Sequence, residues 1–161
     1  MSKCRTVVLA LTGLAIAMPP TLAADDVGYR AHTKAGKFEN VRDDAKDAII
    51  GRGFVIDHVG RLDDMLERTA EAIGNAAQSP YKNAVYFQFC PAKLTHEAVS
   101  ATPFAIANCP IAIFVFEAAV EPGRIQVGYR LPVKTDVPAM RTVNEKLAAL
   151  LDEIAAEATA K

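Results

Sequence analysis

The sequence predicts an α+β domain of two layers, a mostly antiparallel sheet with helices on one face, in the element order βαβαβαββα. Stretches with apolar residues at every second position alternate along the chain with stretches where they recur every third or fourth position. A Glu-Pro-Gly turn at residues 121–123 separates two runs rich in β-branched and aromatic residues, which is typical of an antiparallel hairpin. The length of 161 residues suits one domain.

The first half of the chain predicts a strand, a helix, a strand and a second helix. Residues 27–33 alternate between two faces and predict a half-buried strand. Apolar residues recur at helical spacing over 38–49, and the glycines that follow are typical of a helix end. Residues 54–59 predict the next strand, and the apolar spacing over 62–73 predicts the second helix.

The second half predicts a strand over 84–90, a short helix over 91–100 and an irregular stretch over 102–110. The strands of the hairpin follow over 111–117 and 125–131. Both contain the β-branched and aromatic residues that suit a pleated surface.

A long amphipathic helix is predicted over 136–159, at the end of the chain. Asp136 is a suitable N-cap residue, and Pro138 is compatible with the first turn. The apolar residues that follow recur at helical spacing, so this helix is expected to pack on the sheet.

The first 23 residues have the three-part layout of a secretory signal peptide. Lys3 and Arg5 form a basic start, residues 6–18 carry no charge, and small residues precede cleavage after Ala23 or Ala24. Removal of residues 1–23 leaves a single domain over 24–161. A periplasmic or secreted location is therefore expected. No second uncharged run is long enough to span a membrane, so the mature protein is expected to be soluble and free of the membrane.

Charge and motif content exclude several classes of function. Eighteen Lys and Arg stand against nineteen Asp and Glu, so there is no basic excess for a nucleic acid. The sequence has no GxSxG, HExxH, phosphate-loop or GxGxxG motif. With no catalytic motif found, a non-enzymatic role is favoured.

The two central strands are apolar on both faces. Val85 and Phe87 alternate with Tyr86 in one strand, and Ile113 alternates with Phe114 in the next. In a two-layer fold only one of these faces meets helices, and an uncovered aromatic face usually marks an interface or a ligand site. We therefore expect a homodimer through this face or a small apolar ligand on it. The alternative is that the C-terminal helix or a loop covers the face.

Two cysteines, Cys90 and Cys109, remain after removal of the leader, and each precedes a proline. Three interpretations stay open: a structural disulfide, two unpaired buried thiols, and a redox or metal-binding role. An oxidising compartment favours the disulfide, which would stabilise the fold by about 3 kcal/mol. A thiol redox protein remains an alternative because Cys90 lies at the start of a predicted helix, where the pKa of a thiol is lowered.

His58 is the histidine most suited to a ligand role, because alternation places it on one strand face with Phe54 and Ile56. A partly buried histidine more often forms a hydrogen bond within the core. The alternative is a periplasmic haem- or metal-binding protein that uses His58 with Met65, His96 or a cysteine. There is no CxxCH motif, so only a non-covalent haem or a metal ion is considered.

Several motifs together resemble the family called domain of unknown function 302 (DUF302). The matching segments are Gly53-Phe54-Val55, Phe89-Cys90-Pro91-Ala92, and Asn108-Cys109-Pro110 before the apolar run 111–117. The resemblance covers residues 36–131, and His58-Val59-Gly60 with residues 65–69 is similar to an exported branch. It implies a compact α+β fold that is often dimeric, a role for the paired cysteine positions, and no established activity.

A short similarity joins residues 27–30 and 127–130, both Val-Gly-Tyr-Arg. Nothing else in the two halves aligns, so coincidence between two strands of similar exposure is favoured.

The leading hypothesis from the sequence is a secreted domain of unknown function that acts as a binding or interaction module.

Overall fold

The computed structural model describes residues 28–74 and 79–161. The expected signal peptide over 1–23, with its cleavage site at Ala23 or Ala24, lies outside these residues. The elements in chain order are β1 (Tyr29–Ala35), α1 (Phe38–Ile50), β2 (Ile56–Arg61), α2 (Leu62–Ala70), β3 (Tyr81–Phe89), α3 (Ala92–Ala101), the 3₁₀ helix η2 (Pro103–Asn108), β4 (Ile111–Ala118), β5 (Arg124–Arg130) and α4 (Pro138–Ala160). This order confirms the predicted sequence of strands and α-helices.

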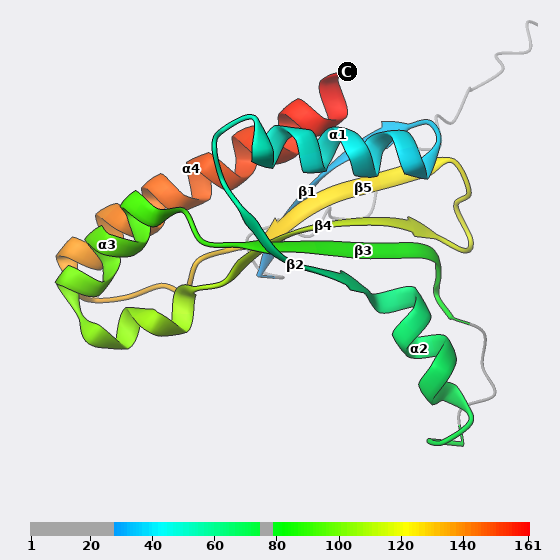
Figure 1. Cartoon of the computed structure of the whole chain (residues 1–161), viewed down its shortest axis with the longest axis horizontal. Helices are drawn as coiled ribbons and strands as arrows, with labels where there is room; N and C mark the ends of the chain where they lie inside the picture. The colour runs from blue at the N-terminus through cyan, green and yellow to red at the C-terminus, as the bar shows by residue number, and fades with distance from the viewer. Residues whose placement is uncertain (1–27, 75–78) are drawn as a thin grey trace, which may run out of the picture.

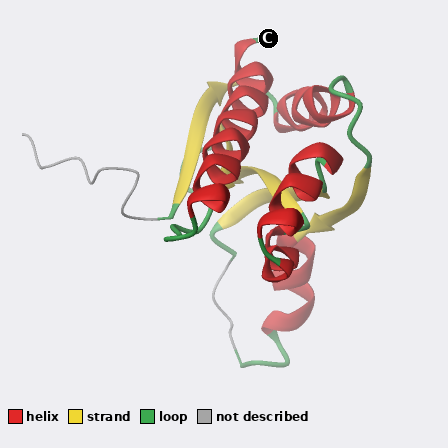
Figure 2. Ribbon diagram, turned by 90° about the vertical axis from the view of Figure 1, so that its left-hand side faces the viewer, coloured by secondary structure: helices red, strands yellow, loops and turns green. Residues whose placement is uncertain are grey.

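The five strands form one sheet in the order β1-β5-β4-β3-β2, and every neighbouring pair is antiparallel. Figure 1 shows α1 and α4 along one face of this sheet, with α3 beside α4 and α2 beyond the opposite side. Figure 2 shows the twist of the sheet and α2 extending away from the other helices. The predicted two-layer α+β fold is confirmed. Within the described residues, no helix is both long and apolar enough to cross a membrane.

The hydrophobic core lies between the sheet and the helices α1 and α4. Its members alternate along the strands, because every second strand residue points to the helix layer. The most deeply buried large side chains are Tyr129, Phe89, Ile49, Ile113, Ile125, Leu151, Ile154, Val41, Val115 and Val127. Three strands therefore direct one row of side chains into the core and leave the other row to the opposite face.

Two local predictions need correction. The stretch 102–110, expected to be irregular, contains the short 3₁₀ helix η2. Asp136 is not the cap of the last helix, because α4 begins at Pro138 with Val137 at the N-cap position. Thr135 Oγ1 accepts a hydrogen bond of 3.2 Å from the Val137 N–H, so a threonine hydroxyl binds the backbone at the start of the helix.

The Val-Gly-Tyr-Arg similarity has a structural counterpart in the pairing of β1 with β5. Tyr29 lies opposite Arg130, and Arg30 lies opposite Tyr129. Because the strands are antiparallel and alternate, each face of the sheet receives one tyrosine and one arginine. Tyr129 is fully buried on the helix side, whereas Tyr29 and Arg130 lie on the other side.

Glu117 is a buried carboxylate that joins β3 to the β4–β5 hairpin. Its side chain accepts hydrogen bonds from Lys82 Nζ at 3.0 Å, Asn83 Nδ2 at 2.8 Å and the Gly123 N–H at 2.8 Å. Burial alone would raise the pKa of Glu117, but these donors outweigh it and hold the pKa below its ordinary value. The ionised form therefore contributes to the stability of the hairpin.

Glu117→Gln is expected to lower the free energy of unfolding by about 1–3 kcal/mol near neutral pH, because an amide group then faces three donors. A carboxylate with a lowered pKa stabilises the fold above its ordinary pKa of 4.5, and that contribution is lost as the pH falls through the folded-state pKa. The difference between variant and wild type should therefore shrink below about pH 4.5 in urea unfolding measured across pH. Glu121→Gln, on the exposed turn of the same hairpin, is the matched control. A difference that stays constant down to pH 2 would contradict this role for Glu117.

Candidate functional site

The candidate site is the open face of the sheet, the side turned away from α1 and α4. The helices α1 and α4 pack on the other face, where the core lies. Among the described residues, only the start of α2 borders the open face. The larger side chains of the open face are Tyr29, Tyr81, Tyr86, Gln88, Phe114, Phe116, Gln126 and Arg130. The predicted aromatic face is therefore present and is not covered by the last helix.

Tyr86 and Phe114 are direct neighbours across β3 and β4, yet their rings lean apart. The Tyr86 ring lies over Gly60 of β2, where any added Cβ atom would collide with the end of the ring. The Phe114 ring lies over Gly128 of β5, where an added Cβ atom would be 2.6 Å from Phe114 Cζ. The two glycines thus provide space for the rings on the outer strands and leave a gap between β3 and β4.

The gap is a hollow of about 410 Å³ on the open face. The hollow is lined by Tyr29, Leu62, Tyr81, Ala84, Val85, Tyr86, Phe114, Val115, Phe116 and Arg130. Ring contacts fix its walls. Tyr29 meets Phe114 edge-on at a centroid distance of 6.4 Å, and Tyr81 meets Phe116 edge-on at 5.5 Å.

The start of α2 is held against the rim of the hollow by Asp63. The carboxylate of Asp63 accepts hydrogen bonds from the Ala84 N–H at 3.1 Å and from Arg61 Nε at 3.1 Å. Burial by itself would raise the pKa of Asp63. The hydrogen bonds from Arg61 and from the Ala84 and Asp64 N–H groups outweigh this effect, so the pKa lies below its ordinary value. This pairing places Leu62 at the edge of the hollow.

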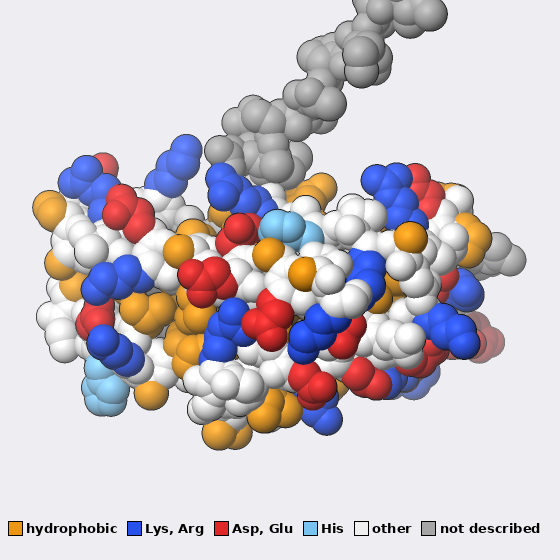
Figure 3. Space-filling view, turned by 90° about the horizontal axis from the view of Figure 1, so that it is seen from above, with side chains coloured by type: hydrophobic (Ala, Val, Ile, Leu, Met, Phe, Trp, Pro, Cys, Tyr) orange, Lys and Arg blue, Asp and Glu red, His pale blue; other side chains and the backbone are white. Residues whose placement is uncertain are grey.

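The polar side-chain groups that line the hollow can all donate hydrogen bonds. The guanidinium of Arg130 can only donate, whereas the hydroxyls of Tyr29, Tyr81 and Tyr86 can donate or accept, and no Asp or Glu from the described residues lines the hollow. The helix-covered face differs, since Figure 3 shows Lys and Arg side chains interspersed with Asp and Glu over it. The hollow therefore combines apolar rings with three hydroxyls and one positive charge.

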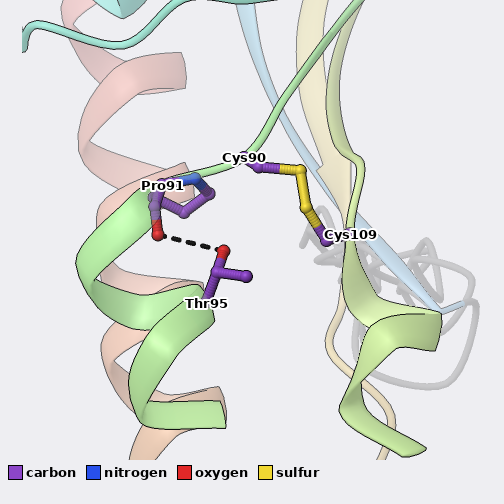
Figure 4. Close-up of a disulfide and its surroundings, with 4 residues drawn as sticks. All are labelled: Cys90, Pro91, Thr95 and Cys109. Carbon is purple, nitrogen blue, oxygen red and sulfur yellow. Dashed lines mark hydrogen bonds between the residues drawn. A yellow bond between two sulfur atoms is a disulfide. The ribbon is translucent and has the colours of Figure 1, made fainter. Parts of the chain in front are cut away.

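Cys90 and Cys109 form a disulfide, with their Cα atoms 5.7 Å apart. Figure 4 shows that the disulfide joins the residue after β3 to the residue between η2 and β4. Thr95 Oγ1 in the first turn of α3 donates a 3.1 Å hydrogen bond to the Pro91 carbonyl beside it. Of the three interpretations of the cysteines, the structure supports the disulfide, so neither thiol is free to act as a metal ligand.

His58 is exposed and does not share a face with Ile56, which corrects the prediction of a partly buried side chain. The register of β2 shifts between these residues: Ile56 lies opposite Phe89, and His58 lies opposite the adjacent Gln88. This irregularity inserts Asp57 into the strand and reverses the alternation. His58 consequently lies on the open face, with its ring centroid 5.9 Å from that of Tyr86.

The other haem or metal candidates are distributed over the molecule. Met65 lies on α2 and His96 lies exposed on α3, and Figure 1 shows these two helices at opposite sides of the molecule. Across residues 28–74 and 79–161, no group of three or more His, Cys, Asp or Glu residues is suited to hold a metal ion.

Three polar members of the hollow, Tyr29, Tyr81 and Arg130, and the apolar Leu62 were not identified from sequence. Alternation places Tyr29 and Arg130 on a face, but only the register of β1 with β5 shows that they are adjacent. A second cluster missed by sequence lies on the helix side. There Asp152 accepts hydrogen bonds from Tyr129 Oη at 3.1 Å and pairs with His32 Nε2 at 2.9 Å. Burial and this carboxylate raise the pKa of Tyr129 to about 12, which suits a structural role as a donor.

Comparisons with known proteins find one family and similar solved structures. The family model described as Domain of unknown function DUF302 matches residues 29–158, a range that includes α4 and extends beyond residues 36–131. The crystal structure of an uncharacterized conserved protein DUF302 from Bacillus stearothermophilus is similar with a TM-score of 0.68 and 10% sequence identity, covering 81% of this chain and 98% of that one. At this identity the likeness shows the fold alone. No curated protein matches the chain.

Proposed function

This chain belongs to the family of the domain of unknown function DUF302, and we propose that it is a non-enzymatic binding module whose ligand lies in the hollow of the open face. The observation that carries this proposal is the separation of Tyr86 and Phe114, which leaves an aromatic-lined hollow of about 410 Å³. Ligand pockets in proteins usually enclose about 300–1,000 Å³ and are mostly apolar, with a few polar groups for orientation. The hollow fits that description.

Export of the mature protein is part of this proposal. The basic, apolar and small-residue segments of residues 1–23 support it. The Cys90–Cys109 disulfide is consistent with it, because such bonds persist in oxidising compartments such as the periplasm. A ligand of this module is thus expected to come from outside the cytoplasm.

A second copy of the chain is the competing occupant of the open face. A homodimer through this face would cover its aromatic side chains, and the partly exposed Met65 of α2 could add to the contact. However, a flat isologous contact would leave the hollow between Tyr86 and Phe114 unfilled, and protein interfaces are close-packed. This favours a small molecule that enters the hollow.

Haem binding, metal binding and thiol redox chemistry have less support as functions. His58, Met65 and His96 lie on three separate elements, and both cysteines are consumed by the disulfide. The open face, by contrast, places five aromatic rings around one hollow.

The mature protein is expected to bind the neutral apolar probe N-phenyl-1-naphthylamine with an increase in probe fluorescence and with one site per chain. Phe114→Ala removes one wall and should weaken binding several-fold, because aromatic contacts contribute beyond the area they bury. Phe104→Ala is the matched control, since Phe104 on η2 is 86% exposed and is not among the residues that line the hollow.

Two results would count against the proposal. One is a titration in which Phe114→Ala and Phe104→Ala bind the probe as the wild type does. The other is a stable dimer in light scattering whose dissociation is needed before any probe binds, which would assign the open face to a second copy.

A further inference from the structure

We infer that the hollow binds a flat, largely apolar molecule with a single carboxylate, and that Arg130 pairs with this carboxylate. This inference rests on the proposed function and specifies its ligand class. It depends on three observations: the shape of the hollow, the charge of Arg130 and the donors around it.

The shape of the hollow favours a flat ligand. Tyr86 and Phe114 lean to opposite sides over Gly60 and Gly128, so the space between them has an aromatic wall on each side. The backbone at Val85 and Val115, which are neighbours in register, lies beneath these rings, and the side chains of both valines point into the core. Aromatic rings prefer offset or edge contacts with other flat groups, so a planar ligand can contact both walls at once.

Arg130 supplies the positive charge. It is exposed at the end of β5 and lines the hollow, and within the described part of the chain no Asp or Glu forms an ion pair with it. Arg124 lies on the same strand and the same face, but Glu121 is within 3.4 Å of its guanidinium. A guanidinium presents paired N–H donors that match the two oxygens of a carboxylate. Arg130 is therefore available for an acidic ligand, whereas Arg124 is not.

A tyrosine hydroxyl, which can donate a hydrogen bond, lies beside Arg130. The hydroxyls of Tyr29, Tyr81 and Tyr86 form no hydrogen bond with any described residue. Tyr29 lies directly opposite Arg130 in the register of β1 and β5. A carboxylate beside Arg130 can therefore also accept a hydrogen bond from the Tyr29 hydroxyl, whereas a cationic group at this position meets the like charge of Arg130.

The test compares three ligands that share one ring system: 2-naphthoate, 2-naphthamide and 2-naphthylmethylammonium. The mature wild-type protein is expected to bind naphthoate at least about tenfold more tightly than the neutral amide, since hydrogen bonds to charged groups are the stronger kind. The ammonium compound should bind most weakly. Arg130→Gln should remove the preference for naphthoate, so that naphthoate and the amide bind with similar affinities. Arg130→Lys should keep part of the preference, and Arg124→Gln should keep all of it.

The outcomes separate this inference from the proposed function. Equal binding of naphthoate and amide by the wild type, or a preference that survives Arg130→Gln, would overturn the carboxylate assignment while leaving the hollow as a binding site. Failure of all three ligands and of the neutral probe to bind would remove both. Circular dichroism of the Arg130 variants, whose side chain is exposed, reports whether each remains folded.

Discussion

Replacing both disulfide cysteines, as Cys90→Ser with Cys109→Ser, is expected to lower the free energy of unfolding by about 3 kcal/mol. The two residues are separated by 19 positions, and the segment between them contains α3 and η2. Without the bond, the unfolded chain gains the freedom that closure of this loop removes. The end of β3 and the start of β4 also lose their covalent link.

Urea unfolding of the mature protein with and without reductant measures this effect. Reduced wild type and the double serine variant should have the same midpoint, lower than that of the oxidised wild type. The double variant is preferred to a single one because it leaves no free thiol to form mixed disulfides. If oxidised wild type, reduced wild type and variant unfold at one midpoint, the disulfide does not stabilise this fold.

Gly60→Ala is expected to lower mainly the affinity for the probe, and Gly128→Ala mainly the stability, although both place a methyl group under an aromatic ring. At Gly60 the new atom meets only the far end of the Tyr86 side chain, which can rotate away from β2. The rotation moves the ring toward β4 and into the hollow. At Gly128 the new atom meets the backbone carbonyl of Arg30 as well as Phe114, and the backbone cannot move without separating β1 from β5.

We therefore expect Gly60→Ala to change stability by less than about 1 kcal/mol, because a less favourable rotamer is offset by a less flexible unfolded chain. Its affinity for the neutral probe should fall at least tenfold, since the ring occupies the site. Gly128→Ala should lower the free energy of unfolding by about 1–3 kcal/mol, the usual effect of overpacking. Thermal unfolding and probe titration of both variants check this pair. Unchanged probe binding by Gly60→Ala would contradict the structural origin given for the hollow.

The order of elements and the aromatic second face could be predicted from the sequence because both depend on local periodicity. The alternation of side chains along the two central strands predicts that Tyr86 and Phe114 point away from the core. The helical spacing of apolar residues predicts that α1 and α4 cover the other side. Length and apolar content then require that these faces pack in one core. A disulfide between the two cysteines could be predicted only as one of three alternatives, since the distance between them depends on the path of the chain through η2.

The predictions that were wrong or missing depend on strand register, which one sequence does not specify. The irregularity at Asp57 reverses the alternation of β2, and this alone moves His58 from the side of Ile56 to the open face. The same limit applies to Tyr29, which lies beside Arg130 only because β1 pairs with β5. The leaning of Tyr86 depends on a glycine that lies 26 positions earlier and one strand away.

The most direct test of the account is to locate the bound neutral probe by NMR chemical-shift mapping on the mature, isotope-labelled protein. The account predicts that the largest shifts fall on the facing rows of β3 and β4, at Ala84, Tyr86, Phe114 and Phe116, and that the amides of α3 and η2 stay unchanged. Shifts concentrated instead around the exposed Phe104 and Ile106, with the rows of β3 and β4 unperturbed, would contradict it.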